Sequence, residues 1–137
     1  MEGTQPPAQP PADPDPPPEE ANRPSAVQVA DAISADILAI HRDSYGGGAD
    51  RAQAYVLDDT VVVMLDGLEL LPNEEFLIEQ GRGDGVTHLR ELFQKSIEPT
   101  FSAAVERATG RRVIGFASHF ELGDQPFAVE IFRLEPE

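Results

Sequence analysis

The chain has 137 residues, no cysteine and a formal net charge of -15. The lack of cysteine excludes disulfides and thiolate metal sites, and the negative charge disfavours binding to nucleic acid or to anionic lipid. No apolar run approaches the ~18 residues of a membrane span, and the N-terminus lacks the basic start and apolar core of a signal peptide. We therefore expect a soluble, cytoplasmic protein without direct membrane insertion, whose partner is a basic protein surface or a cationic ligand.

Residues 1–24 contain nine prolines, five acidic residues and almost nothing to bury. A segment of this composition does not offset the entropy cost of becoming ordered. We predict a disordered, Pro-rich acidic tail at 1–24 and a single domain at 25–137. The PxxP spacings of the tail leave an SH3-like partner open as an alternative to a plain solubilising spacer.

Organised structure is expected to begin with a helix after residue 24. Ser25 and Gln28 have the spacing of a capping box. Apolar residues then recur every three or four positions up to the glycines at 46–48, which predicts an amphipathic helix of about five turns. The apolar face is formed by Ala26, Ala30, Ile33, Ile37 and Ile40. The solvent side is expected to carry Asp31, Ser34 and Asp36.

A β-hairpin is predicted for residues 54–65, which read AYVLDDTVVVML. Two apolar runs flank the polar turn at Asp58, Asp59 and Thr60. The second run, residues 61–65, has no polar alternation, so both of its faces need apolar cover.

A short helix is predicted next, with Asn73 as its N-cap, Phe76 and Leu77 as its apolar anchors and Gly81 as its end. A long helix is predicted for residues 86–109. Pro99 falls inside this second helix, which indicates a kink or a boundary between two helices.

Residues 112–122 and 127–134 alternate well enough to form strands joined by a turn. The sequence therefore predicts an α+β fold with a small mixed or antiparallel four-stranded sheet, made of two hairpins and packed with about three helices. The predicted order is α-β-β-α-α-β-β.

Motifs for catalysis or metal binding are few. The glycines at 46–48 lack the preceding strand and following Lys-Ser/Thr of a phosphate loop, and the chain has no GxSxG signature. His41, His88 and His119 lie on separate elements, and each is interpreted as a surface or half-buried residue rather than a ligand. We expect no enzyme activity, no cofactor and no metal. Asp58 and Asp59 are interpreted as turn formers. The alternative is a divalent cation held by this pair with help from the carboxylates of Asp50, Asp66 and Glu69.

Arg90 and Glu130 are charged residues within otherwise apolar elements. A buried charge needs a partner, so these two side chains could pair with each other or meet a ligand. The favoured interpretation is that each faces solvent.

Four stretches of the sequence resemble the MpsC-like family, small proteins associated with a Na+-translocating, membrane-potential-generating system. The stretches are GGGADRAQAYVLDDTVVVMLDG, NEEFLIEQGRGDGVTHLRELFQ, FSAAVERATGRRVIGFASHFE and FAVEIFRLEP, in the family's order and spacing between about Tyr45 and Pro136. Within them we select as candidate interaction or structural residues Arg51, Asp58, Asp59, Glu75, Arg90, Gly110, Arg111 and Glu130. The chain departs from the family at residues 46–49, where Gly-Gly-Gly-Ala replaces Gly-Lys/Arg-Gly-Pro.

The resemblance implies a soluble accessory or regulatory component rather than an enzyme. Its expected partner is a membrane protein of an ion or inorganic-carbon transport system, which would place the chain at the periphery of the membrane. The alternative is a ligand-sensing domain that binds a small molecule between sheet and helices.

A homodimer is expected on separate grounds. Three helices in so short a chain do not suffice to cover both faces of four strands, and an uncovered apolar face usually marks an interface.

Overall fold

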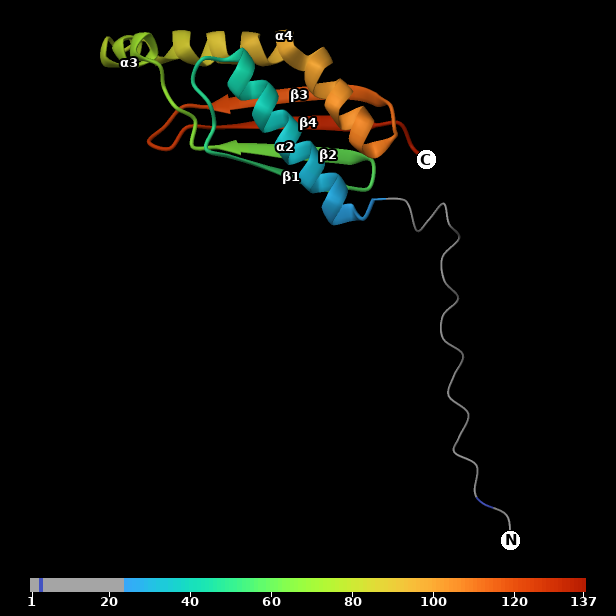
Figure 1. Cartoon of the computed structure of the whole chain (residues 1–137). Helices are drawn as coiled ribbons and strands as arrows, with labels where there is room; N and C mark the ends of the chain where they lie inside the picture. Colours follow the sequence, from blue (N-terminus) through green and yellow to red (C-terminus); the bar gives the residue numbers. More distant parts are fainter. Residues whose placement is uncertain (1–2, 4–23) are drawn as a thin grey trace.

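The computed structural model describes residue 3 and residues 24–137. The tail predicted at 1–24 therefore lies almost wholly outside the described residues. The described domain has two layers, with a four-stranded antiparallel sheet on one side and helices on the other (Figure 1). The element order α-β-β-α-α-β-β and the α+β class are confirmed.

The first helix of the domain, α2, runs from Ala26 to Ser44. Its start is the predicted capping box, because the Ser25 hydroxyl accepts from the Gln28 amide at 3.1 Å and the Gln28 side chain accepts from the Ser25 amide at 2.8 Å. Ser34 is not on the solvent side as predicted. Its hydroxyl accepts from the Ala54 amide at 2.8 Å and so joins α2 to the first strand.

The sheet consists of β1 (Arg51–Leu57), β2 (Thr60–Asp66), β3 (Val113–Glu121) and β4 (Phe127–Leu134). Its order is β1-β2-β4-β3, so that the two hairpins meet in the middle through β2 and β4. The β1–β2 turn requires a positive φ of 50° at Asp58, a conformation that Asp tolerates better than most residues.

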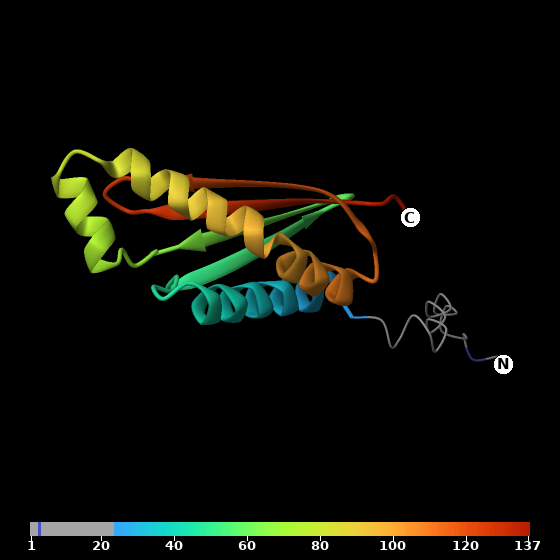
Figure 2. The same ribbon diagram turned by 90° about the horizontal axis from the view of Figure 1, so that it is seen from above.

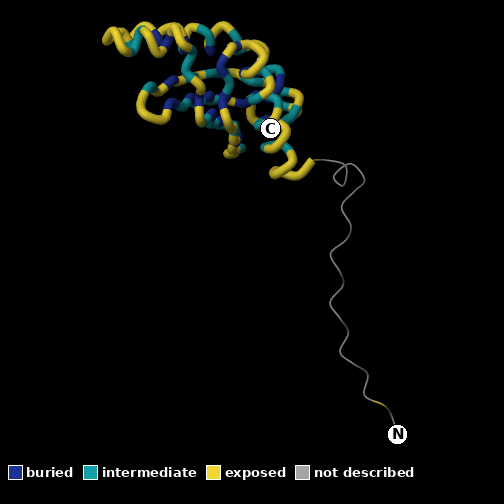
Figure 3. Tube along the Cα trace, turned by 60° about the vertical axis from the view of Figure 1, so that its left-hand side comes forward, coloured by how far each residue is buried: buried dark blue, intermediate teal, exposed yellow. Residues whose placement is uncertain are grey.

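Side chains on the inner face of the sheet form the core with α2 and with the long helix α4 (Gly83–Thr109). Val61, Val63 and Leu65 alternate along β2 and are fully buried, and Ala128 and Phe132 occupy equivalent inner positions on β4. The buried segments of the tube lie on the strands and on the helices that pack against them (Figure 3). Ile33 and Ile37 of α2 and Phe101 and Val105 of the last helix complete this core.

The outer face of the sheet has no helix over it within the described residues. Figure 2 shows α2 and α4 together on one side of the strands and none of the described helices on the other. Val62 and Met64, the outward residues of β2, are only partly buried. The expectation that both faces of residues 61–65 find apolar cover is therefore wrong within the described domain.

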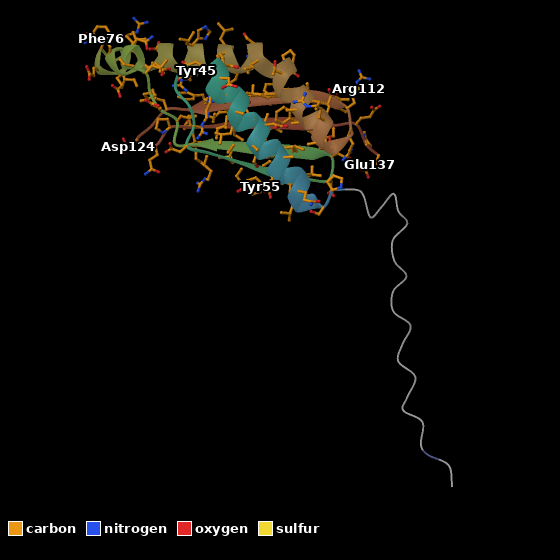
Figure 4. The ribbon with its side chains drawn as sticks, in the orientation of Figure 1. Tyr45, Tyr55, Phe76, Arg112, Asp124 and Glu137 are labelled. Carbon is orange, nitrogen blue, oxygen red and sulfur yellow. The ribbon has the colours of Figure 1, made fainter. Side chains whose placement is uncertain are left out.

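Two helices connect the hairpins. The short helix α3 (Pro72–Glu79) has Leu71 as its N-cap and Pro72 in its first turn, so the prediction that Asn73 is the cap is wrong. The prediction that Phe76 is an anchor is also wrong, since its side chain is 59% exposed at the outer end of the molecule (Figure 4). Leu77 does pack on the core.

The long helix α4 extends from Gly83 to Thr109 and ends at Gly110, which adopts the left-handed conformation with φ of 69°. It continues as one helix past Pro99 and changes direction towards its C-terminal end (Figure 1). A bend is the expected effect of a proline that removes one backbone hydrogen bond.

Candidate functional site

A buried ion pair between Arg90 of α4 and Glu74 of α3 is the centre of the candidate site. The Arg90 Nε donates to Glu74 Oε2 at 2.7 Å, and Nη2 donates to Oε1 at 2.6 Å. Both side chains are 1% exposed. The prediction that Arg90 faces solvent is wrong, and so is its suggested pairing with Glu130. A bidentate contact of this kind fixes both the position and the orientation of the guanidinium.

Further contacts enclose the ion pair. Arg90 Nη2 donates to the Glu69 carbonyl at 2.8 Å, and the Leu71 amide donates to Glu74 Oε1 at 2.8 Å. The Tyr45 hydroxyl donates to Glu74 Oε2 at 2.7 Å, while its ring lies 4.0 Å from the Arg90 guanidinium carbon. The site therefore connects the end of α2, the segment before α3 and the N-terminal part of α4, near the Tyr45 label of Figure 4.

An aromatic group packs beside the ion pair. The rings of Tyr45 and Phe93 meet edge to face at 4.7 Å, and His41 stacks on Tyr45 at 6.1 Å. Burial first, and the Arg90 charge second, lower the pKa of His41 to about 4. Since His41 is 1% exposed, its imidazole is neutral at pH 7. The interpretation of His41 as a surface or half-buried residue is therefore wrong.

The electrostatics of the ion pair keep Glu74 charged and Tyr45 protonated. Burial alone would raise the pKa of Glu74, but hydrogen bonds from Arg90, the Leu71 amide and Tyr45 hold it below its ordinary value. Burial and the bond to Glu74 raise the pKa of Tyr45 to about 12. One positive and one negative charge thus balance each other in the interior, where both side chains are 1% exposed.

Glu130 is a second buried charge site, and it lacks an ionic partner among the described residues. It lies on the inner face of β4, 0% exposed, between Val63 and Ser118 of the neighbouring strands. The Ser118 hydroxyl donates to Gln94 Oε1 of α4, and no described residue forms a hydrogen bond with either Glu130 oxygen. Burial raises the pKa of Glu130 to about 8, an effect that the nearby Ser118 hydroxyl offsets only in part.

Arg111 joins three parts of the chain at the opposite end of the sheet. Its Nη1 donates to the Asp58 carbonyl at 3.0 Å, its Nη2 to Asp59 Oδ1 at 2.5 Å, and its Nε to the Glu135 carbonyl at 3.1 Å. Gly110, the C-cap of α4, brings the chain to this position. Asp58 and Asp59 therefore form the hairpin turn, and they also accept hydrogen bonds from Arg111 through the Asp58 carbonyl and the Asp59 carboxylate.

The remaining predicted residues lie on the surface and apart from these sites. Arg51 forms an exposed ion pair with Asp66 at 3.3 Å, and Glu75 is exposed in the first turn of α3. Asp66 pairs with the first residue of β1, whereas Asp58 and Asp59 lie at the other end of the hairpin. Within residues 24–137, the structure gathers no group of three or more His, Asp or Glu side chains suited to a metal ion.

Sequence reasoning missed Glu74 and Tyr45 and selected Glu75 instead. The signal was the helical phase: Glu74 shares a face with Leu77 and Ile78, which pack on the core. Placing the helix start at Pro72 makes Glu74 the third helical residue, from which a carboxylate reaches back to the N-cap amide. That phase points Glu74 inward and Glu75 outward.

Two open hollows lie on the surface at opposite ends of the sheet. The hollow beside the end of α4 has a volume of about 880 Å³ and is lined partly by Arg107, Arg111 and Arg112. The other has a volume of about 1060 Å³ and is lined partly by Asp50, Asp66 and Asp124. Figure 4 shows Arg112 and Asp124 at these opposite ends.

A comparison with protein-family models matches residues 25–135 to the family described as Na+-translocating membrane potential-generating system (MpsC). The chain belongs to the MpsC family. The match covers nearly all of the described domain, including Arg90, Glu74, Glu130 and Arg111. Searches of curated proteins and of solved structures gave no match.

MpsC membership links this chain to a membrane system. Among the described residues, none of the helices combines the length with the apolar character needed to cross a bilayer.

Proposed function

We propose that this MpsC protein is a non-catalytic accessory or regulatory component of a Na+-translocating, membrane-potential-generating system, and that it acts by docking on a membrane-protein partner. The observation that carries the proposal is that the buried ion pair and its tyrosine partner are used within the fold. Glu74 forms a buried ion pair with Arg90 and accepts a hydrogen bond from the Tyr45 hydroxyl. These side chains hold α2, α3 and α4 together. The exposed surface of the domain is therefore the part that meets other molecules.

The charge of the chain supports the kind of partner. A protein with a net charge of -15 is repelled by an anionic leaflet, while cytoplasmic loops of membrane proteins carry an excess of Lys and Arg. Electrostatic attraction should therefore steer the chain to a membrane protein rather than to lipid. Docking should weaken with salt, because the Debye length falls from ~10 Å at 0.1 M to ~3 Å at 1 M.

Co-sedimentation tests the proposal. The full chain is mixed with native membranes or with protein-free anionic liposomes, each at low and at high salt. We expect recovery with native membranes at low salt only. Recovery with bare liposomes, or with neither sample, rejects docking on a membrane protein.

Paired charge variants sharpen this assay. Asp50→Asn with Asp124→Asn removes two exposed acids from one end of the sheet, and Asp31→Asn with Asp43→Asn removes two exposed acids from α2. Both double variants change the net charge equally. Equal losses of recovery indicate diffuse steering, whereas a larger loss for one pair locates the contact surface.

One observation favours a second candidate function, a domain that senses a small molecule between sheet and helices. Three buried side chains retain polar atoms without a hydrogen-bond partner in the described domain, namely His41 Nδ1, Arg90 Nη1 and both Glu130 oxygens. Unsatisfied buried groups of this kind can be completed by a ligand. A rise in melting temperature with a metabolite, lost in Glu130→Gln, would favour sensing, and no shift across a metabolite panel would leave docking as the function.

A further inference from the structure

The outer face of the sheet is an apolar surface without cover in the described domain. Strand register places Tyr55, Val62, Ile131 and Ala117 in one row across all four strands. The adjacent row contains Gln53, Met64, Val129 and His119, so it is apolar on the two central strands and polar on the two edge strands. Tyr55 is 49% exposed although it sits in the apolar part of this face. Figure 2 shows no helix on this side.

The Arg, Asp and Glu residues of this face lie at its two ends, and His119 lies in a central row with its Nε2 3.0 Å from Glu121 Oε2. Arg133 is exposed at the end where β4 nears the β1–β2 turn, since it pairs with Thr60. Asp66 lies at the opposite end of β2 with its ion-pair partner Arg51, and Glu121 ends β3 at that same end. Two arginines and two carboxylates therefore balance on this face, within a chain whose net charge is -15.

We propose that the outer face of the sheet packs against the same face of a second copy of this chain. Consider a two-fold axis that lies in the interface, runs across the strands and passes between these two central rows. It places each central row of one copy over the other central row of the partner. The same rotation brings Arg133 of each copy towards the end that carries Asp66 and Glu121 in the other. A two-fold interface has to be complementary to itself, and the charges of this face meet that requirement.

The charge balance also explains why this face, rather than another, is the one that associates. Two copies of a strongly acidic chain repel each other, and they approach most easily through a surface that carries no net charge. Two sheets packed face to face keep their strand directions within about 30° and bury the side chains between them. The dimer is thus a four-layer assembly with helices on both outer sides.

Sedimentation equilibrium of the full chain tests the inference. We expect twice the mass of one chain at micromolar concentration, with a dissociation constant that falls as salt is raised, because salt screens the repulsion between the acidic copies. This salt dependence is opposite to that of docking on a basic partner, so the two proposals fail separately. A monomer at both low and high salt overturns the dimer.

Two sets of variants locate the interface. Ile131→Lys should weaken dimerisation at least about tenfold, as truncated central interface residues do, whereas Leu92→Lys on the exposed side of α4 should not. Arg133→Glu should also weaken it, and Arg133→Glu combined with Glu121→Arg should restore it. Circular dichroism confirms that each variant is folded. Equal dimerisation of Ile131→Lys and the natural chain, or no rescue by the charge exchange, overturns the proposed face.

Discussion

Arg90 and Glu74 form an ion pair with two hydrogen bonds, of 2.7 and 2.6 Å, and each of the two side chains is 1% exposed. The two residues lie on different helices, so the pair fixes how α3 sits against α4. The low polarity around it strengthens the attraction, and it equally raises the cost of leaving one charge alone.

Removal of either partner should be strongly destabilising. Arg90→Ala or Glu74→Ala should lower the free energy of unfolding by about 3–5 kcal/mol, because each leaves the other charge buried without compensation. Replacement of both by apolar residues, Arg90→Met with Glu74→Leu, should cost less than the sum of the single changes. Urea denaturation measures these values.

The neighbouring acid supplies the control for this prediction. Glu75→Gln removes an exposed carboxylate one position away and should change the free energy of unfolding by no more than about 0.5 kcal/mol. A cost for Glu75→Gln equal to that for Glu74→Ala would mean that the buried pair is not what holds α3.

The architecture could be predicted from the sequence because it depends on local and periodic signals. The capping box at Ser25, the hairpin turn at Asp58 and the helix end at Gly110 each follow from the chemistry of a few adjacent residues. These signals decide which elements form and in what order. They say little about which element lies next to which.

The candidate site could be predicted only in part because its contacts are long-range. Arg90 and Glu130 were recognised as unusual, but Tyr45 and Glu74 are separated by 29 positions and meet only in the folded chain. The choice between Glu74 and Glu75 depended on the start of α3, and a shift of one or two residues there reverses which acid points inward. Pairing of Arg90 with Glu130 was an alternative that the sequence left open, and in the structure Arg90 pairs with Glu74 instead.

Deletion of residues 1–24 should leave the domain folded. The composition of this segment offers little apolar surface to bury, and Ser25, which caps α2, is retained. The melting temperature of the shortened chain should stay within about 3 °C of that of the full chain, a change of less than ~1 kcal/mol in stability. A large drop, measured by circular dichroism, would show that the segment packs on the domain.

Arg111→Ala should destabilise the end of the sheet. The side chain donates to the Asp58 and Glu135 carbonyls and to the Asp59 carboxylate, and the loss of these bonds should cost about 1–3 kcal/mol. Arg111→Lys should not restore the loss, since an ammonium group does not reproduce the planar set of donors. Amide hydrogen exchange should accelerate at the β1–β2 turn and at the end of β4.

Arg112 is the matched control, because it carries the same charge one position later and is exposed. Arg112→Ala should leave both stability and exchange near those of the natural chain. If the two variants behave alike, the contribution of Arg111 is its charge alone rather than its contacts.

Glu130 should make the protein less stable as pH rises. Its pKa is about 8 in the folded chain against an ordinary value of 4.5, so the folded state holds a proton that the unfolded state releases between these values. His41 has the opposite effect, since its pKa falls from 6.5 to about 4 on folding and its contribution is lost as pH falls below 6.5. Below pH 6.5 the two groups change the free energy of unfolding in opposite directions as pH rises. Above pH 6.5 only the effect of Glu130 remains.

The window between pH 6.5 and 8 therefore isolates Glu130 from His41. The free energy of unfolding of the natural chain should fall there by about 2 kcal/mol, which corresponds to one proton over this range. Glu130→Gln keeps the shape of the side chain without an ionisable proton, so this decrease should be absent and the variant should be the more stable of the two at pH 8. Glu79→Gln, on the exposed surface of α3, should retain the decrease. If the slope is unchanged in Glu130→Gln, the carboxyl group is not protonated in the folded chain at neutral pH, and a partner that keeps it charged must be present.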